Sequence, residues 1–457
     1  MKRLTTIMLI GIISVAAWFG WRHLRPVRDH ELAVWLTGDI RGRLVPCGCF
    51  TGQLGGLTRI ATMMGAAPPD TTLKVDIGDA LAGTADYERI KLGTIHRALA
   101  SLGFDAANLG HREAALSAEQ LRALAKDSSV PLLGANLLDA STGAPVAKTH
   151  VIVKKAGWRI AIVGVMDSRI AAENLGTGLR LDAAENSIAR ILPALKTQAD
   201  FRVLLAFTDE ATLHTLARTF PEFDLVLGGK VTQPAQRVEH EGRAGIFYVT
   251  NESRALGRMN VKLNEAGRMS IAKAEVQLVH DQIGEDKAIA DLAKHYRDQI
   301  RKTRLDVDDP SKSGNDLVPG VRATATFAGS ESCAKCHPGA DHAWRETGHA
   351  RAFSTLVKHG ANADPNCIAC HTVGFGTPGG YRREFAATKL TDVGCESCHG
   401  PGSRHVASRI AGDAEAGRLR PLGTGDCQHC HHGEFSRPFE WKEFWPLVKH
   451  GKEGAAK

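Results

Sequence analysis

Residues 31–49 read ELAVWLTGDIRGRLVPCGC and decide the fold of the larger part of the chain. A short apolar run that ends at Gly38 and Asp39 is typical of a buried strand leading into a functional loop. Similar runs return downstream and alternate with helical patterns, which predicts an α/β domain over residues 30–282. We expect further strands at 73–79, 130–138, 159–167, 201–207 and 224–230, and helices at 56–65, 87–103, 117–127, 186–198 and 209–219. Ser117 and Gln120 have the spacing of a capping box at the start of the third helix.

The chain has 457 residues, of which 43% are hydrophobic and 23% charged, as in soluble proteins of two or three domains. Its first residues differ from the rest. Lys2 and Arg3 precede an apolar run at 7–21, and three arginines follow by residue 28. This layout predicts that residues 1–28 are a signal peptide or an N-terminal membrane anchor. The protein is therefore expected in the periplasm or otherwise exported, free or anchored to the inner membrane.

Eight of the ten cysteines lie after residue 330 in four units, CAKCH at 333–337, CIACH at 367–371, CESCH at 395–399 and CQHCH at 427–431. Each unit has the haem c attachment pattern, in which two thiols bind the porphyrin and the histidine binds its iron. Zinc sites share the cysteine spacing, but four copies that each include the histidine favour haem. We therefore expect four covalently bound haem c groups. The attachment cysteines are Cys333, Cys336, Cys367, Cys370, Cys395, Cys398, Cys427 and Cys430, and the proximal ligands are His337, His371, His399 and His431.

A six-coordinate haem iron needs a second axial ligand. Eleven of the 20 histidines lie beyond residue 330, so seven are left for four distal positions. His349, His405 and His450 are the predicted distal ligands, and the fourth position stays open among His342, His359, His429 and His432. Because residues 328–457 are too few for a conventional core around four porphyrins, we expect a small, mainly α or irregular domain with the haems as its core. One short helix is expected at 340–358.

The segments GSESCAKCHPGADHAWRETGHARAF, CIACHTVGFGTPGGY and VGCESCHGPGSRHV resemble the tetrahaem cytochrome family whose type member accepts electrons from hydroxylamine oxidoreductase. The resemblance implies a periplasmic electron carrier with mostly bis-histidine haems, and one haem of that family can lack a distal ligand. Redox partner proteins are therefore expected, either other cytochromes or a membrane quinol-linked donor. The formal charge of +7 does not indicate nucleic acid, since four oxidised haems with their propionates would lower it to about +3.

Upstream, GDIRG, GGLTR, DIGDAL, FDAANLGHRE and DLVLGGKVTQ resemble the metallophosphatase domain of periplasmic 5′-nucleotidases. That family holds two metal ions between Asp, Asn and His side chains. Asp39 and Asp79 match two of its ligands, and His111 stands at the position of its ligand asparagine. We interpret these three residues as a vestigial metal site. Arg41 and Arg112 replace histidines of the family, so they are expected to repel divalent metals and to neutralise Asp39 and Asp79 partly, together with Lys230.

Cys47 and Cys49 do not form a haem unit, because one residue separates them and Phe50 follows. Their alternatives are structural thiols, a readily reduced disulfide, or a two-thiolate site for a redox reaction or a soft metal.

Residues 283–327 are expected to be a helix and linker between the metallophosphatase-like domain and a cytochrome domain at 328–457. These patterns predict an electron-transfer protein whose first domain is not hydrolytic. A redox enzyme acting at an open haem or at Cys47 and Cys49, and a residual phosphoesterase, are the alternatives. No catalytic residue is assigned.

Overall fold

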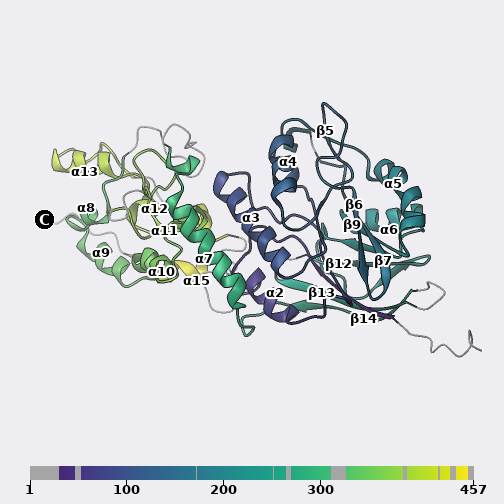
Figure 1. Cartoon of the computed structure of the whole chain (residues 1–457). Helices are drawn as coiled ribbons and strands as arrows, with labels where there is room; N and C mark the ends of the chain where they lie inside the picture. The colour runs from purple at the N-terminus through teal and green to yellow at the C-terminus, as the bar shows by residue number, and fades with distance from the viewer. Residues whose placement is uncertain are drawn as a thin grey trace, which may run out of the picture.

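The computed structural model describes residues 30–46, 53–170, 172–250, 252–263, 269–309, 326–383, 389–419, 422–432 and 439–450. The leader predicted at 1–28 and the pair Cys47 and Cys49 lie outside these residues. The described chain forms a larger lobe of sheets and helices and a smaller helical lobe, with helix α7 (Lys287–Lys302) between them (Figure 1). Within the described ranges, no helix has both the length and the apolar composition to cross a bilayer.

The larger lobe is an α/β sandwich built on two six-stranded sheets. In the first sheet, β1 (His30–Thr37) pairs in parallel with β2 (Thr72–Asp76) and antiparallel with β13 (Ala255–Leu263). Its order is β14 (Met269–Leu278), β13, β1, β2, β3 (Ala106–Asn108) and β4 (Leu132–Leu133). The second has the order β11 (Glu239–Glu241), β12 (Ala244–Tyr248), β10 (Leu225–Gly228), β9 (Phe201–Phe207), β7 (Trp158–Met166) and β6 (His150–Lys155). The α/β prediction is confirmed.

The helices of this lobe lie close to the ranges that the sequence indicates. They are α2 (Leu57–Met64), α3 (Asp86–Ser101), α4 (Ala118–Asp127), α5 (Ala184–Gln198) and α6 (Glu210–Thr219). The Ser117 hydroxyl accepts from the Gln120 backbone N–H and the Gln120 side chain accepts from the Ser117 N–H, so the capping box is confirmed.

One strand prediction was wrong. The run 130–138 is not a single strand but divides into β4 and β5 (Leu137–Asp139), and β5 pairs with β8 (Leu179–Leu181) in a separate two-stranded sheet. Asn136 causes the turn between them. Its amide donates to the Met166 and Asp182 carbonyls and its oxygen accepts from the Met166 N–H, which draws the chain out of the first sheet.

The smaller lobe consists of short helices. They are α8 (Ser330–Ala334), α9 (Pro338–Arg345), α10 (Ala352–Lys358), α11 (Pro365–His371), α12 (Cys395–His399), α13 (Ser403–Ile410), α14 (Thr424–Gln428) and α15 (Trp441–Phe444). The single helix expected at 340–358 is wrong, because the chain breaks between α9 and α10 at a 3-10 turn, Gly348–Arg351. Gly348 weakens the helix there.

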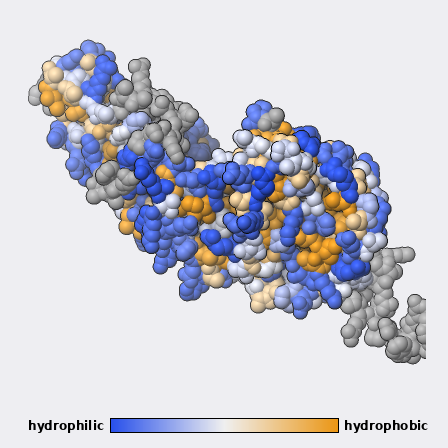
Figure 2. Space-filling model, turned by 45° about the horizontal axis from the view of Figure 1, so that its top comes forward, coloured by the Kyte–Doolittle hydropathy of each residue, from blue (hydrophilic) through white to orange (hydrophobic). Residues whose placement is uncertain are grey.

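Apolar packing differs between the lobes. The larger lobe has one extensive buried cluster across both sheets, whereas the described part of the smaller lobe has a limited cluster around Phe353, Ile368 and Tyr381. Several large hydrophobic side chains of the smaller lobe are exposed, among them Ile410 and Leu447. Both lobes otherwise present a mixed and largely hydrophilic surface (Figure 2). Side-chain packing alone therefore gives the smaller lobe little core.

Helix α7 belongs to both lobes. Its buried Ala293, Tyr296 and Ile300 lie on one face of the helix, and it packs against α2 and α3. From the same helix, Arg297 donates to the His359 carbonyl at 3.0 Å and Arg301 donates to the Gly360 carbonyl at 3.2 Å. Helix α7, within the region expected to be a helix and linker, thus fastens the two lobes together.

Candidate functional site

The three residues interpreted from the sequence as a vestigial metal site lie at the carboxyl ends of neighbouring parallel strands. Asp39 follows β1, Asp79 follows β2 and His111 follows β3. The Asp39 N–H donates to the Gly78 carbonyl at 2.7 Å, and the Arg112 N–H donates to the Asp79 carboxylate at 2.9 Å, so these loops lie together. Asp39 and Asp79 both have positive φ angles, 56° and 59°. Such backbone strain is typical of functional loops in this fold position.

Arginines occupy this corner beside the carboxylates. Arg41 Nε lies 2.5 Å from Asp39 Oδ1, and Arg41 Nη1 lies 2.6 Å from Glu252 Oε1. Arg112 Nε lies 3.7 Å from Asp79 Oδ2. Each aspartate is nearly buried and has a guanidinium within ion-pair distance. The guanidinium groups supply the positive charge that metal ions supply in a di-metal site.

The sequence predicts that Lys230 neutralises Asp39 and Asp79, but the structure places it elsewhere. Its Nζ lies 3.0 Å from Asp167 Oδ2, after β7, rather than beside Asp39 or Asp79. Arg169 binds the same Asp167 carboxylate at 2.9 Å, and His111 Nε2 lies 3.1 Å from the Asp167 carbonyl. Asp167 is therefore a second carboxylate with its own pair of cations. The His111 side chain contacts the backbone carbonyl of Asp167, not its carboxylate.

Burial controls the ionisation of this corner. It raises the pKa of Asp39, which Arg41 offsets only in part. It also raises the pKa of Asp79, with a further increase from neighbouring Glu113. Asp76, fully buried and hydrogen-bonded by Thr37 Oγ1 at 2.7 Å, has its pKa raised to about 7. Among the described residues, no group of three or more His, Cys, Asp or Glu side chains has an arrangement that could hold a metal ion.

Sequence reasoning missed two carboxylates that organise the corner. Glu113 accepts hydrogen bonds from the backbone N–H groups of Asp79, Leu81 and Gly110, at 3.1, 2.6 and 2.8 Å. Glu252 binds Arg41 and also Arg43, whose Nη2 lies 3.2 Å from Glu252 Oε2. Glu113 belongs to the GHRE segment, so its place in that motif could have identified it from the sequence. Glu252 lies outside every motif, and only the fold places it here.

The four CxxCH units line one large cavity in the smaller lobe, which extends to the boundary with the larger lobe. Its volume is about 2510 Å³, whereas sites for single small molecules measure roughly 300–1,000 Å³. The lining includes all eight attachment cysteines, the four motif histidines, and His349, His405 and His450. Of the four candidates for the remaining distal position, all of which are described, only His359 lines it.

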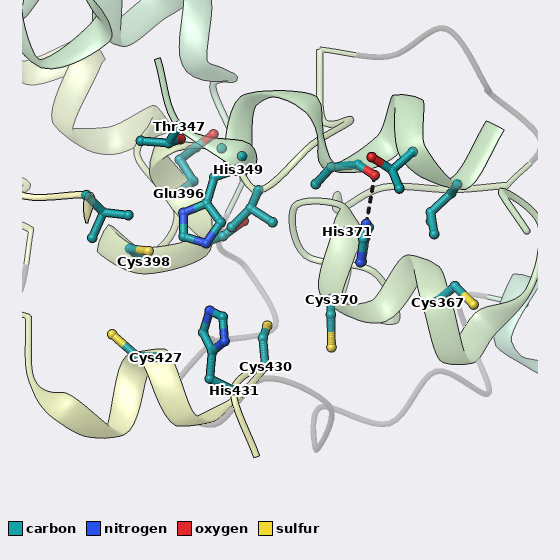
Figure 3. A pocket seen from close by; sticks show the side chains of 18 of the residues that line it. Thr347, His349, Cys367, Cys370, His371, Glu396, Cys398, Cys427, Cys430 and His431 are labelled. Atoms are coloured by element: carbon teal, nitrogen blue, oxygen red, sulfur yellow. Dashed lines mark hydrogen bonds between the residues drawn. The ribbon is translucent and has the colours of Figure 1, made fainter. Parts of the chain in front are cut away.

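Three pairs of histidines face each other across this cavity. The ring centroids of His337 and His405 lie 6.3 Å apart, those of His349 and His431 lie 6.1 Å apart, and those of His399 and His450 lie 5.9 Å apart. Figure 3 shows His349 and His431 directed toward one another. Two metal–imidazole bonds of about 2 Å and two ring radii of about 1 Å add up to about 6 Å. Each spacing therefore fits one iron between two imidazoles.

His371 belongs to the remaining unit and is oriented by the backbone. Its Nδ1–H donates to the Ala352 carbonyl at 2.7 Å, drawn as the dashed line in Figure 3. This bond fixes the tautomer that has its lone pair on Nε2, the form in which an imidazole binds a metal. His371 therefore has the orientation and protonation of an axial ligand.

The four units associate in two pairs. Cys333 and Cys395 interact through their side chains, and so do Cys370 and Cys430. The first and third units are therefore adjacent, and the second and fourth units are adjacent. Figure 3 shows Cys370 and Cys430 on facing segments of the second pair.

Glu396, which sequence reasoning missed, holds the first pair in place. Its carboxylate accepts from the N–H groups of Ala328, Gly329 and Gly402 at 2.8, 2.7 and 2.6 Å. Three chain segments around the first and third units thus meet at one buried carboxylate, which occupies the variable position of CESCH.

The residues present fit the haem groups that the motifs imply. The three histidine pairs leave room for an iron between their rings, and the cavity is larger than a site for one small molecule. The cavity volume and the histidine spacings both agree with haem.

Comparison with known proteins separates the two lobes. Residues 332–400 match the family model of cytochrome c554 and c-prime, a range that contains three of the four units. Cytochrome c-554 of Nitrosomonas europaea is 41% identical over 105 residues, which cover 20% of this chain and 43% of the relative. The smaller lobe is thus similar to c-type cytochromes, proteins with covalently bound haem c.

The larger lobe resembles solved metallophosphatases. The sulfate thiohydrolase SoxB of Thermus thermophilus is 17% identical with a TM-score of 0.51, over 60% of this chain and 61% of that one. The calcineurin-like phosphoesterase YfkN of Bacillus subtilis is 18% identical with a TM-score of 0.50, over 60% and 98% of the two chains. A 5′-nucleotidase precursor, also of Thermus thermophilus, is 18% identical with a TM-score of 0.49, and the match spans 59% of each chain. The matches to SoxB and YfkN give the larger lobe a metallophosphatase-like α/β fold.

Proposed function

We propose that this protein is a periplasmic tetrahaem c-type cytochrome that transfers electrons, and that its metallophosphatase-like domain at 30–282 is not hydrolytic. The observation that carries the proposal is the set of histidine pairs across one cavity that the four attachment units line. A bound haem c supplies one-electron transfer at its iron. The cytochrome domain would then cover 328–457, with 283–327 as the joining segment and 1–28 as the leader.

The chain's own residues hold the groups in defined positions. In this proposal, His337 and His405, His399 and His450, and His431 and His349 are the axial pairs of the first, third and fourth units. His371 is the proximal ligand of the second unit, oriented by the Ala352 carbonyl. The position opposite His371 is either His359, which lines the cavity, or an open coordination site.

Redox proteins of the same compartment are the proposed partners, either other cytochromes or a quinol-linked donor. The exposed apolar Ile410 and Leu447 support electron exchange at the surface of the smaller lobe, because both also line the haem cavity. The formal charge, reduced by the haem propionates, gives no support to a nucleic-acid partner.

Haem stoichiometry tests the proposal directly. We expect four irons and four covalently bound haems per chain, measured by elemental analysis, by pyridine haemochrome absorbance and by the mass of the intact holoprotein. The paired substitution Cys427→Ser and Cys430→Ser should leave three haems. A holoprotein with fewer than four haems per chain, or one whose haems are not attached covalently, would contradict it.

A redox reaction at Cys47 and Cys49 is a second candidate function, because the residues on both sides of that pair reach the haem cavity. Pro46 and Gln53 line it together with Cys367, Cys370 and His371. Electrons from the cytochrome domain would then reduce a disulfide to two thiols, with two electrons and two protons taken up. The test titrates the thiols of the oxidised and the reduced holoprotein. Two additional thiols on reduction, absent in the Cys47→Ser/Cys49→Ser variant, support it, and an unchanged thiol count excludes it.

A further inference from the structure

The second haem-attachment unit is held by a side chain of the larger lobe. Glu88, on α3, accepts a hydrogen bond from the Asn366 side-chain amide at 2.5 Å. Asn366 lies within α11, one residue before Cys367. Glu88 is 4% exposed, so this contact is made inside the boundary between the lobes and not on its rim.

A buried lysine lies beside the same carboxylate. Lys91, one turn further along α3, places its Nζ 3.5 Å from Glu88 Oε2 and 5.4 Å from the centre of the Tyr296 ring. Burial lowers the pKa of Lys91, but Asp364, Tyr296 and Glu88 more than offset burial, so the pKa of Lys91 is raised overall. Lys91 therefore stays charged. Cys367 is also among the groups that interact with it electrostatically, which places this charge next to the second unit.

Two further observations show that this polar group faces the haem cavity. Glu88, Lys91 and Tyr296 all line the cavity together with Cys367, Cys370 and His371. Tyr296 is 3% exposed, and its hydroxyl has no hydrogen-bond partner among the described residues. A buried hydroxyl normally has a partner, so the cavity side of this group is built for contact with a polar molecule or cofactor edge.

We propose that Lys91 and Glu88, both supplied by the metallophosphatase-like domain, set the reduction potential of the haem attached at CIACH. The larger lobe would thus act on electron transfer through buried charge. This inference rests on the proposed function, since it requires that the second unit binds haem. The metallophosphatase-like domain, which has arginines at positions where metallophosphatases bind metals, would then tune the potential of a haem in the other domain.

The sign of each effect follows from electrostatics. Reduction adds one negative charge at the iron, which a nearby cation stabilises and a nearby anion opposes. A charge in a poorly solvated site acts more strongly than one in water. Removing the Lys91 charge should therefore lower the midpoint potential of this haem. Removing the Glu88 charge should raise it, and removing both should return it toward the wild-type value.

The experiment compares Lys91→Met, Glu88→Gln and the double variant in the full holoprotein. Redox titration monitored by electron paramagnetic resonance follows each haem by its own signal. Each single variant should change the reduced-to-oxidised ratio of one haem by about tenfold at fixed potential, which equals 59 mV for a one-electron couple. The other three haems should change less than threefold. Glutamine can still accept from Asn366, and Lys91→Arg, which keeps the charge, should restore the wild-type titration.

Arg97→Met provides the matched control, because Arg97 is an exposed cation on the same helix. It should leave all four potentials unchanged. If Lys91→Met prevents folding, Glu88→Gln and Asp364→Asn still test the sign, since both remove a negative charge at this site and should raise the potential. Shifts of the same sign in Lys91→Met and Glu88→Gln, or equal shifts of all four haems, would overturn the inference. A holoprotein without four reducible haems would instead refute the proposed function.

Discussion

The imidazole rings of His337 and His405 face each other with centroids 6.3 Å apart and planes inclined by 22°. The two residues come from the first unit and from α13, which follows the third unit. A histidine beyond one haem unit is thus the axial partner proposed for another, and the fold of the smaller lobe depends on such exchanges between units.

Removal of His405 should convert one haem from low spin to high spin, because its iron loses one of two strong-field ligands. We expect His405→Ala to lower the low-spin signal by one haem per chain in electron paramagnetic resonance. The same loss is expected separately for His349→Ala and His450→Ala. His240→Ala, an exposed position in the larger lobe, should have no effect. An unchanged low-spin count in His405→Ala would disprove this pairing.

The purified protein should not hydrolyse p-nitrophenyl phosphate when zinc or manganese is added. Arg41 and Arg112 stand within ion-pair distance of Asp39 and Asp79, and positive charge there opposes a divalent cation. The assay is the release of nitrophenolate with and without added metal, with a chelator-treated sample as control. Metal-dependent turnover that Asp39→Asn abolishes would show that the ancestral chemistry survives.

Asp76 should make the larger lobe less stable as the pH rises from about 4 to about 7. The folded state keeps its proton up to pH about 7, whereas an unfolded aspartate loses it near 3.8. The folded state therefore binds more protons in that window, and its stability falls by at most about 1.4 kcal/mol per pH unit. Asp76→Asn should reduce this slope without abolishing it, because the pKa values of Asp39 and Asp79 are also raised.

Urea unfolding at several pH values across that window, followed by tryptophan fluorescence, measures the slope. Asp291→Asn, which removes an exposed carboxylate on α7, should leave it as in the wild type. Equal slopes for Asp76→Asn and the wild type would contradict the prediction.

Arg383 and Asp308 form a buried ion pair that ties the segment after α7 to the smaller lobe. Arg383 also donates to the Ile300 and Thr303 carbonyls at 2.9 and 3.0 Å. Removing one partner of a buried pair leaves the other charge without compensation, so Arg383→Met should cost about 3–5 kcal/mol. Lys287→Met removes an exposed pair with Asp291 and should cost about 0–1 kcal/mol. Unfolding followed by Soret absorbance compares the two, and similar losses would show that burial at Asp308 is unimportant.

The sequence predicts elements well where one local pattern determines them. The apolar runs that end at Asp39 and Asp79 became strands β1 and β2, and Ser117 with Gln120 capped α4. Local pattern failed at Asn136, whose bonds to Met166 and Asp182 are made across the fold. An apolar run gives no sign of such a long-range polar contact.

The candidate site divides in the same way. The CxxCH units are visible in the sequence because a porphyrin fixes their spacing. Seven further histidines lie beyond residue 330, and His349, His405 and His450 were predicted among them as distal ligands. The structure places each of these three across the cavity from a motif histidine. Glu88, Glu252 and Glu396 were not, because ordinary glutamates have no local signature and act through contacts with distant segments. Lys230 was expected near Asp39 and Asp79 because its segment resembles the metallophosphatase motif that supplies the last metal ligands, and the structure places it beside Asp167 instead.

The bond between Glu88 and Asn366 joins residues 278 positions apart and so has consequences for inheritance. If recombination transferred the cytochrome segment to another gene, the segment would lose the α3 surface that its second unit contacts through Asn366 and Glu88. A substitution on either side of this shared boundary therefore affects the other side, and selection acts on both parts together.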